Sequence, residues 1–229
     1  MSTLEDRSRA AAQTGALWRI ATTRLPTKWG TFEMMGFERD AWTGRTAETA
    51  LALVLGDLSR GVPLLRVHSQ CLTGEVFGSM RCDCGGQLDL AMQAIAQEGC
   101  GLVIYECQEG RGIGLMAKLQ AYELQDAGID TIEANQALGF KADFRDFSLA
   151  AAILHDLRIP RVRLLTNNPR KVRALKDDGI EVVERLPCEV GPTAHSRAYL
   201  QTKKQKMGHA LSLEIPEPGS PLRMIEAHL

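Results

Sequence analysis

The segment that most constrains the fold of this chain spans residues 161–178 and reads RVRLLTNNPRKVRALKDD. A short apolar strand is followed there by a polar turn and then by a helical pattern. Asn168 can cap that helix, and Pro169 suits its first turn, where the missing N–H is not needed. Gly179 ends the helix, and a further strand is predicted from Glu181 to Arg185. A strand, a helix and a second strand in this order predict an α/β core.

Strand and helix signals continue toward the N-terminus. Alternating residues between Arg24 and Glu38 predict a strand, a turn around Gly30 and a second strand. Shorter runs predict strands at 51–58, 64–68 and 101–105 and helices at 88–96, 115–124 and 148–157, the last with Ser148 as its N-cap. Because the first sixty residues carry mainly strand patterns, we expect an α/β fold with a mixed β-sheet flanked by helices and a β-rich N-terminal portion.

The chain shows no internal repeat and no linker strong enough to divide it. We therefore expect a single domain over residues 21–211. Residues 1–20 are predicted to form an N-terminal arm or a short helix. Residues 212–229 contain several prolines and glycines and are predicted to form a flexible tail.

The charge balance bears on the class of ligand and on the compartment. The 229 residues include 27 basic and 28 acidic side chains, which gives a net charge of -1. No global field favours nucleic acid or an anionic membrane, so an anionic ligand requires a local basic pocket. The N-terminus lacks the apolar stretch of a secretory signal, and no apolar run reaches the length of a membrane span. These features predict a cytoplasmic protein.

Three of the six cysteines lie within residues 71–84, which read CLTGEVFGSMRCDC. The spacing C-x10-C-x-C gathers Cys71, Cys82 and Cys84, and no local Cys or His supplies a fourth ligand. Structural zinc usually has four protein ligands, whereas catalytic zinc has three and an open position for water. The pattern therefore predicts a hydrolytic zinc site.

Disulfides are a poorer explanation for the cysteines. A chain of this length with an ordinary apolar content does not need such cross-links, and a framework that includes two cysteines one residue apart is awkward. The remaining three thiols are expected to be small buried apolar residues: Cys100, Cys107 and Cys188.

Four polar segments carry side chains that suit an anion or a proton transfer, and each also has an ordinary structural explanation. The donors of Arg66–Gln70 precede the first cysteine, although the arginine is equally suited to pair with a surface carboxylate. Gln108–Leu115 is a glycine-rich strand-to-helix turn with an arginine, but it lacks a complete dinucleotide or P-loop motif. Thr166 and Lys171 flank a helix N-terminus, and a solvated helix face explains the lysine equally well. The charges of Asp143–Asp146 are either surface charge or include a proton acceptor.

In their order along the chain, these segments resemble GTP cyclohydrolase II from about residue 25 to residue 211. The motifs that carry the resemblance are RVHSQCLTG, RCDCG, QEGRGIGL, ADFRDF, LLTNNPRK and TKKQKMGH. None is decisive alone, but their joint occurrence in this order is highly specific. The resemblance implies that residues 21–211 form a catalytic domain that opens the imidazole ring of GTP, releases formate and diphosphate, and begins riboflavin biosynthesis. It also implies a homodimer.

The resemblance further implies roles for individual residues. One zinc ion per chain would be bound by Cys71, Cys82 and Cys84, with water as the fourth ligand, and Mg²⁺ would accompany the triphosphate. The catalytic residues would be Asp143 as proton acceptor, Arg145 at the position of a proposed nucleophile, and Tyr122 in ring opening and deformylation. The GTP site would be lined by Arg66, Val67, His68, Ser69, Gln70, Gln87, Glu109, Gly110, Arg111, Thr131, Thr166 and Lys171.

Several features leave the outcome of the reaction open. Gln70 stands where the family generally has an acid, and Cys107 and Phe144 replace positions expected to be polar or charged. Arginine is almost never unprotonated, so Arg145 could instead stabilise charge on the α-phosphate while water attacks. The alternatives are a paralogue that yields a formamide or only a diphosphate-cleaved product, or a non-catalytic zinc-stabilised nucleotide-binding protein. No long additional region is present for a fused dihydroxybutanone-phosphate synthase, so we expect one function.

Overall fold

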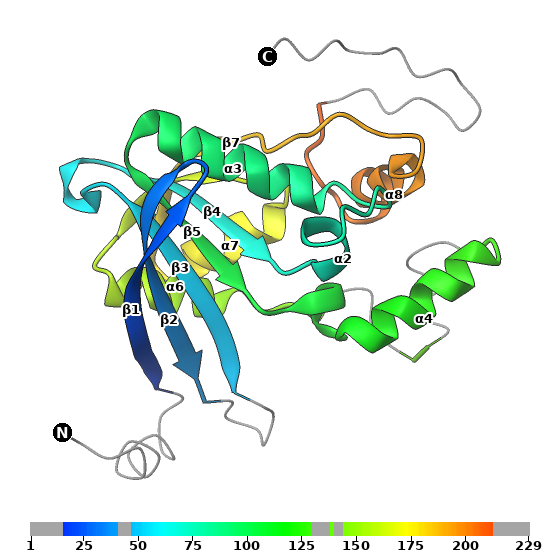
Figure 1. The fold of residues 1–229 in the computed structure, drawn as a ribbon, viewed down its shortest axis with the longest axis horizontal. Helices are drawn as coiled ribbons and strands as arrows, with labels where there is room; N and C mark the ends of the chain where they lie inside the picture. Colours follow the sequence, from blue (N-terminus) through cyan, green and yellow to red (C-terminus); the bar gives the residue numbers. More distant parts are fainter. Residues whose placement is uncertain (1–15, 41–46, 130–137, 140–143, 213–229) are drawn as a thin grey trace.

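The computed structural model describes residues 16–40, 47–129, 138–139 and 144–212, which form a seven-stranded β-sheet flanked by helices (Figure 1). The strand order is β1-β2-β3-β5-β4-β6-β7. The strands are β1 Leu17–Thr27, β2 Gly30–Arg39, β3 Glu48–Leu55, β4 Leu64–Ser69, β5 Gly101–Glu106, β6 Arg161–Leu165 and β7 Glu181–Leu186. The pairs β1/β2, β2/β3 and β3/β5 are antiparallel, whereas β4 pairs in parallel with β5 and β6, and β6 pairs in parallel with β7. The predicted mixed sheet with a β-rich N-terminal portion is confirmed.

Helices cover both faces of the sheet. The helices that pack on the sheet are α3 Cys84–Glu98, α6 Ser148–Asp156 and α7 Pro169–Asp177. The others are α2 Leu72–Glu75, α4 Leu115–Asp126 and α8 Arg197–Lys206, which lie beyond the strand ends in Figure 1, with short 3₁₀ turns η1 Leu58–Arg60 and η2 Glu109–Gly112. On β5, Val103 packs in the cluster with α3, and its neighbours Leu102 and Ile104 pack in the larger cluster with α6 and α7. The alternation of side chains along a strand thus fills two cores, one on each face.

The connections explain why α3 and α6 lie on opposite faces. The chain moves from β4 to β5 in one direction across the sheet, and from β5 to β6 in the other direction past β4. Parallel crossovers are nearly always right-handed, so opposite directions place the connecting helices on opposite faces. The sheet order therefore brings the carboxyl ends of β5, β4 and β6 side by side.

The predicted strand–turn–helix unit is present, and its local signals act as expected. The Asn168 side chain accepts a hydrogen bond from the Arg170 N–H at 2.9 Å, and Pro169 is the first residue of α7. Gly179 follows the helix with a φ of 81°, a left-handed conformation that favours glycine. The prediction of Ser148 as an N-cap is wrong, because Phe147 occupies that position. The carboxylate of Asp146 instead accepts the Ser148 N–H at 2.9 Å.

Two boundaries near the N-terminus differ from the sequence prediction. The strand expected over 51–58 spans Glu48–Leu55, because Gly56 turns the chain with a φ of 75°. β1 begins at Leu17, within the segment expected to form an arm or short helix. Residues 1–15 and 213–229 lie outside the described residues.

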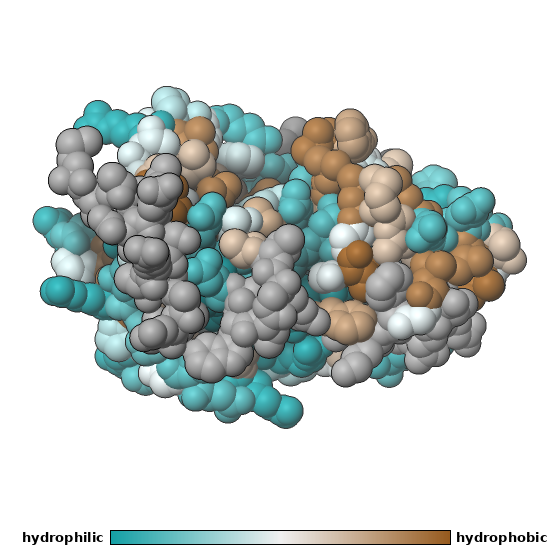
Figure 2. Space-filling model, turned by 90° about the horizontal axis from the view of Figure 1, so that it is seen from below, coloured by the Kyte–Doolittle hydropathy of each residue, from teal (hydrophilic) through white to brown (hydrophobic). Residues whose placement is uncertain are grey.

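One part of the surface is notably apolar. Within the described ranges, the exposed large hydrophobic side chains include Val76 and Phe77 after α2 and Met116 and Leu119 on α4. Figure 2 shows brown apolar side chains toward the right of its view, the side on which Figure 1 places α2 and α4. None of the helices in the part of the chain that the structure describes is long and apolar enough to cross a membrane.

Candidate active site at the carboxyl ends of the parallel strands

The loops after β4, β5 and β6 meet at one edge of the sheet and bring distant polar segments together. β4 leads into Cys71, β5 leads into η2, and β6 leads into Thr166 and the N-terminus of α7. Open sheets with parallel strands generally bind ligands in the crevice outside the carboxyl ends of those strands. Two adjoining pockets lie here, and their shared lining residues are Ser69, Cys84, Arg111, Arg145 and Tyr199.

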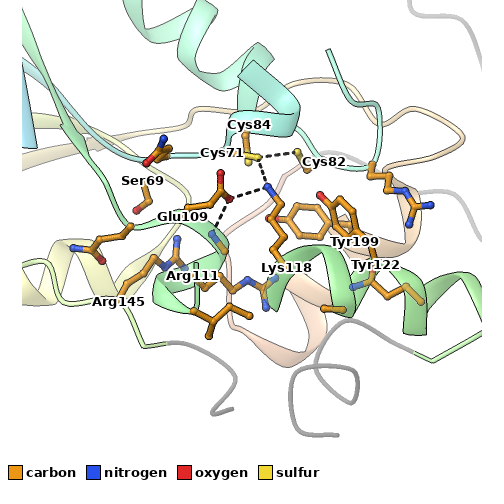
Figure 3. Close-up of a pocket in the computed structure, with 17 residues that line it drawn as sticks. Ser69, Cys71, Cys82, Cys84, Glu109, Arg111, Lys118, Tyr122, Arg145 and Tyr199 are labelled. Carbon is orange, nitrogen blue, oxygen red and sulfur yellow. Dashed lines mark hydrogen bonds and ion pairs between the residues drawn. The ribbon is translucent and has the colours of Figure 1, made fainter. Parts of the chain in front are cut away.

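The first pocket contains the cysteine cluster (Figure 3). The Sγ atoms of Cys71, Cys82 and Cys84 all lie within 4.8 Å of one another, and those of Cys71 and Cys82 are 3.7 Å apart. Sulfurs at two corners of a zinc tetrahedron with bonds of about 2.3 Å lie about 3.8 Å apart. All three residues are free thiols, and within the described ranges no fourth potential ligand joins the cluster. The donor set therefore fits a tetrahedral zinc ion with one position open.

Close packing of α2 holds the cluster together. A Cβ added to Gly74 would lie 3.0 Å from Cys82 Sγ and 3.3 Å from Cys71 Sγ, so only glycine fits without movement. Glu75 Oε1 accepts the Cys71 N–H at 2.8 Å, and the same oxygen lies 2.8 Å from His68 Nε2. Burial lowers the pKa of His68 to about 4. A neutral His68 therefore donates from Nε2 to the carboxylate.

A buried lysine lies against the cluster. Lys118 Nζ donates to Cys71 Sγ at 3.2 Å and to Glu109 Oε1 at 2.8 Å, as the dashed lines in Figure 3 show. Burial acts to lower the pKa of Lys118, but its hydrogen bond to Glu109 and the nearby Cys71 raise it above the ordinary value. Lys118 therefore carries a positive charge beside the sulfur. No motif in the sequence singles out this residue.

The turn η2 has an unusual backbone. Gly110 and Arg111 have φ angles of 62° and 61°, in the left-handed region. A non-glycine residue there is strained, and such strain gathers at functional sites. Arg111 Nη1 and Nη2 are buried and have no hydrogen-bond partner within the part of the chain that the structure describes. The guanidinium lies 5.7 Å from the centre of the Tyr199 ring and lines both pockets.

The second pocket is strongly basic. Its cationic lining residues are Arg66, Arg111, Arg145, Lys171 and Lys203, and no carboxylate belongs to its described lining. Burial, together with Arg66 and Arg145, lowers the pKa of Lys171 well below its ordinary value. An anion in this pocket would favour the protonated lysine, since opposite charges stabilise each other. The local basic pocket that an anionic ligand requires in a chain of net charge -1 is therefore present.

A buried polar network joins this pocket to the loop that carries Cys82 and Cys84. Asp83, between two of the cysteines, accepts hydrogen bonds from Lys203 at 2.6 Å and from Gln87 at 2.5 Å. Gln87 Oε1 in turn accepts from Arg66 at 2.7 Å, and Arg66 also donates to the Leu165 carbonyl. Burial acts to raise the pKa of Asp83, but Lys203 lowers it below the ordinary value. The helix α8 is thereby fixed to the loop that carries the cysteines.

Comparison with known proteins identifies the family. A family model described as GTP cyclohydrolase II matches residues 18–187. The chain belongs to the GTP cyclohydrolase II family. It is 55% identical over 196 residues to GTP cyclohydrolase-2 of Shewanella amazonensis (strain ATCC BAA-1098 / SB2B), covering 85% of this chain and 94% of the relative. It is 54% identical over 194 residues to GTP cyclohydrolase-2 of Hahella chejuensis (strain KCTC 2396), covering 84% and 92% respectively.

A solved structure is more distantly similar. It is a crystal structure of RibBX, a two domain 3,4-dihydroxy-2-butanone 4-phosphate synthase from A. baumannii. Its TM-score is 0.42 at 17% identity, and the match covers 78% of this chain and 42% of that one. This likeness is too remote to support an argument about the present chain.

The residues that the GTP cyclohydrolase II resemblance implied fall into three groups in the structure. Those that line one or both pockets are Cys71, Cys82, Cys84, Arg66, His68, Ser69, Gln70, Gln87, Glu109, Gly110, Arg111, Tyr122, Arg145, Thr166 and Lys171. The side chain of Val67 belongs to the apolar core, and its carbonyl accepts from Lys171 Nζ at 2.8 Å. Thr131 and Asp143 lie outside the described residues.

The structure also places residues at the site that sequence reasoning missed. Lys118, Tyr199, Lys203 and His209 all line a pocket. The motif TKKQKMGH contains two of them, but nothing in its pattern distinguishes a buried lysine from an exposed one. The prediction for Cys107 is wrong, because its side chain is exposed, whereas Cys188 is buried as expected.

Proposed function

We propose that this protein is a zinc-dependent GTP cyclohydrolase II that opens the imidazole ring of GTP and releases formate and diphosphate. The observation that carries the proposal is the trio of cysteine sulfurs within 4.8 Å of one another, beside a pocket whose described lining has five cationic side chains and no carboxylate. The names of the relatives support GTP as substrate. The product is then a diaminopyrimidine nucleotide monophosphate, which places the reaction at the first step of riboflavin biosynthesis.

Each of the two pockets suits a chemically different part of the nucleotide. A triphosphate matches the basic pocket, where Arg111 offers two buried nitrogens with no hydrogen-bond partner among the described residues and buried Thr166 and Lys171 belong to the lining. The purine then extends into the first pocket, toward the cysteines and Tyr122. Mg²⁺ would accompany the triphosphate, since Mg²⁺ sites usually combine substrate phosphate oxygens with only one or two ligands from the protein.

The chain's own residues prepare the reaction. Zinc held by three thiolates supplies an activated water for hydrolysis of the purine ring when bound. Tyr122 lies at the cysteine side, with its hydroxyl 3.4 Å from Thr73 Oγ1. Burial raises the pKa of Tyr122, so its hydroxyl remains a proton donor at neutral pH. Asp143 is proposed as the proton acceptor by family analogy.

Arg145 is proposed to stabilise charge at the phosphates. Its side chain lines both pockets and lies 5.4 Å from the centre of the Phe147 ring. A guanidinium with a pKa above about 12 is protonated at neutral pH and is a poor nucleophile, so water is the better attacking group for diphosphate release. Near wild-type diphosphate release by Arg145→Lys would contradict both a nucleophilic and a bidentate role.

Several wider features belong to the same proposal. We propose a single catalytic domain that begins with β1 at Leu17 rather than at residue 21 and extends to residue 211, in a cytoplasmic homodimer, with an N-terminal arm before it and a flexible C-terminal tail after it. Exposed Val76, Phe77 and Met116 give apolar surface near α2 and α4 that suits a protein interface. The free nucleotide, and not a nucleic acid, is the proposed partner.

The test combines metal analysis with mass analysis of the product formed from GTP. We expect formate, diphosphate and a diaminopyrimidine from protein that contains one zinc per chain. Cys82→Ser should lose ring opening and bound metal, yet it can still release diphosphate because the basic pocket is unchanged. A retained formamide would indicate the incomplete paralogue, and unchanged GTP with full zinc occupancy would indicate a non-catalytic binding protein. Ring opening without any bound metal would refute the zinc mechanism.

A further inference from the structure

Lys118 lies against the cysteine cluster, and the proposed reaction assigns it no role. It belongs to the first turns of α4, and its side chain is only 11% exposed. Its Nζ donates both to Cys71 Sγ at 3.2 Å and to Glu109 Oε1 at 2.8 Å. One ammonium therefore links a metal-binding sulfur to a carboxylate of the strained turn η2.

The contacts of Glu109 close this link into a ring. Glu109 Oε2 accepts the N–H of Leu72, the residue after Cys71, at 2.7 Å. Glu109 Oε1 also accepts the N–H of Gly110 at 2.7 Å, at the start of the left-handed segment that carries Arg111. A change at Lys118 would thus reach both the sulfur of Cys71 and the turn that lines the basic pocket.

The charges of the metal site explain why a cation is needed there. Three thiolates and one divalent ion have a net charge of -1, and the neighbouring Glu109 adds another negative charge. Burying such charge without compensation is unfavourable, because the protein interior solvates ions poorly. Lys118 supplies one positive charge and a hydrogen-bond donor directly to the sulfur. A hydrogen bond to a thiolate also reduces the electron density that the sulfur donates to a metal.

We propose that Lys118 is a positioning residue of the metal centre, which holds Cys71 and Glu109 in one geometry and compensates the charge of the metal-bound thiolates. This inference rests on the proposed cysteine metal site. If Lys118 only formed a structural ion pair with Glu109, its loss would lower stability and leave the bonding between sulfur and metal unchanged. Spectroscopy of the metal centre distinguishes these two roles.

The experiment uses the full-length protein loaded with Co²⁺ in place of zinc, because cobalt reports thiolate coordination through its sulfur-to-metal charge-transfer absorption. Lys118→Met removes the charge and the donor while it retains a similar length, and Lys118→Arg retains both. Lys28→Met is the matched control, since Lys28 is 70% exposed, lies over the Trp29 ring and pairs with Asp89, and neither of these two charged residues lines either pocket. Thermal unfolding of each metal-free variant identifies any general loss of folding.

We expect the charge-transfer band of Lys118→Met to move to longer wavelength, because a thiolate without its hydrogen bond is a better electron donor. We also expect metal release to a chelator to be about 10–100-fold faster, because removing a partner of a metal ligand lowers metal affinity by about that factor and we assign the loss to the release step. Lys118→Arg should recover most of both properties, and Lys28→Met should match the wild type.

The inference is overturned if Lys118→Met binds cobalt with an unchanged band and an unchanged release rate. That result would leave the cysteine metal site itself intact. If the wild-type protein bound cobalt without any sulfur charge transfer, the metal site and the inference would both be wrong. The two failures are therefore distinguishable in one set of spectra.

Discussion

Replacing Arg111 with glycine should separate ligand binding from folding at one position. The φ of 61° at Arg111 is unfavourable for a residue with a Cβ by roughly 1 kcal/mol. Its Nη1 and Nη2 are buried without a partner in the described ranges, and such unpaired donors destabilise the protein by about 1–3 kcal/mol. Glycine relieves both effects, although the greater conformational entropy of glycine in the unfolded chain reduces the gain in stability by about 0.4–1 kcal/mol. Losing the cation–π contact with the Tyr199 ring reduces the gain in stability by a further 0.5–1 kcal/mol or so.

We therefore expect the ligand-free Arg111→Gly protein to gain about 1 kcal/mol in unfolding free energy, or roughly 2–4 °C in Tm for a chain of this size. Affinity for a non-hydrolysable GTP analogue should fall. Hydrogen bonds from a guanidinium to a phosphate contribute about 1.5–3 kcal/mol, which corresponds to a loss of roughly 10–150-fold in Kd. Calorimetric titration at fixed ionic strength and thermal denaturation without ligand measure the two effects separately.

Arg111→Lys is the companion variant, because it retains a charge and a Cβ in the left-handed conformation. It should show intermediate affinity and no gain in Tm. A loss of more than about 1 kcal/mol of stability in Arg111→Gly would mean that the guanidinium has a structural partner within the protein. Unchanged affinity for the analogue would mean that Arg111 does not contact the phosphates, and the reasoning would be refuted.

Three further changes test the surroundings of the site. Gly74→Ala should lower the bound metal measured by elemental analysis, because the added Cβ would lie 3.0 Å from a cysteine sulfur, whereas Gly36→Ala has nothing within 4 Å and should retain full metal. Burial raises the pKa of Glu106 to about 7 from 4.5, so the stability due to its protonated form is fully present below pH 4.5 and is lost as the pH rises through 7. In urea unfolding, the free energy of unfolding of Glu106→Gln should therefore rise relative to wild type by up to about 3 kcal/mol between pH 4.5 and pH 7. A difference that stays constant over this pH range would contradict the assignment. Lys203→Met leaves Asp83 buried without its cation and should lower stability by about 3–5 kcal/mol, which circular dichroism would detect as a lower Tm; no change would show that Asp83 finds another partner.

Local signals in the sequence were sufficient to predict much of the fold. The cap at Asn168, the proline after it and Gly179 define α7 within a few residues, because each acts through its own backbone. Ser148 was assigned wrongly because serine at a helix start can be either the cap or the first helical residue, and the capping carboxylate came from Asp146 instead. The position of β4 between β5 and β6 has no local signal, since it depends on pairing between residues far apart in the chain.

The site shows the same division between local and long-range information. The cysteine cluster was predictable because its three sulfurs come from fourteen consecutive residues, so spacing alone carries most of the geometry. Lys118 and Lys203 were not predictable, because a lysine on a polar helix face normally extends into water. Each is buried against a carboxylate from a turn or loop that follows a strand: Glu109 after β5 for Lys118, and Asp83 after β4 for Lys203. A motif identifies residues that act together within one segment, whereas the cations that lie against the cysteine cluster and its loop come from elsewhere in the chain. Variants of Lys118 and Lys203 therefore test how parts of the fold outside the cysteine segment affect metal binding.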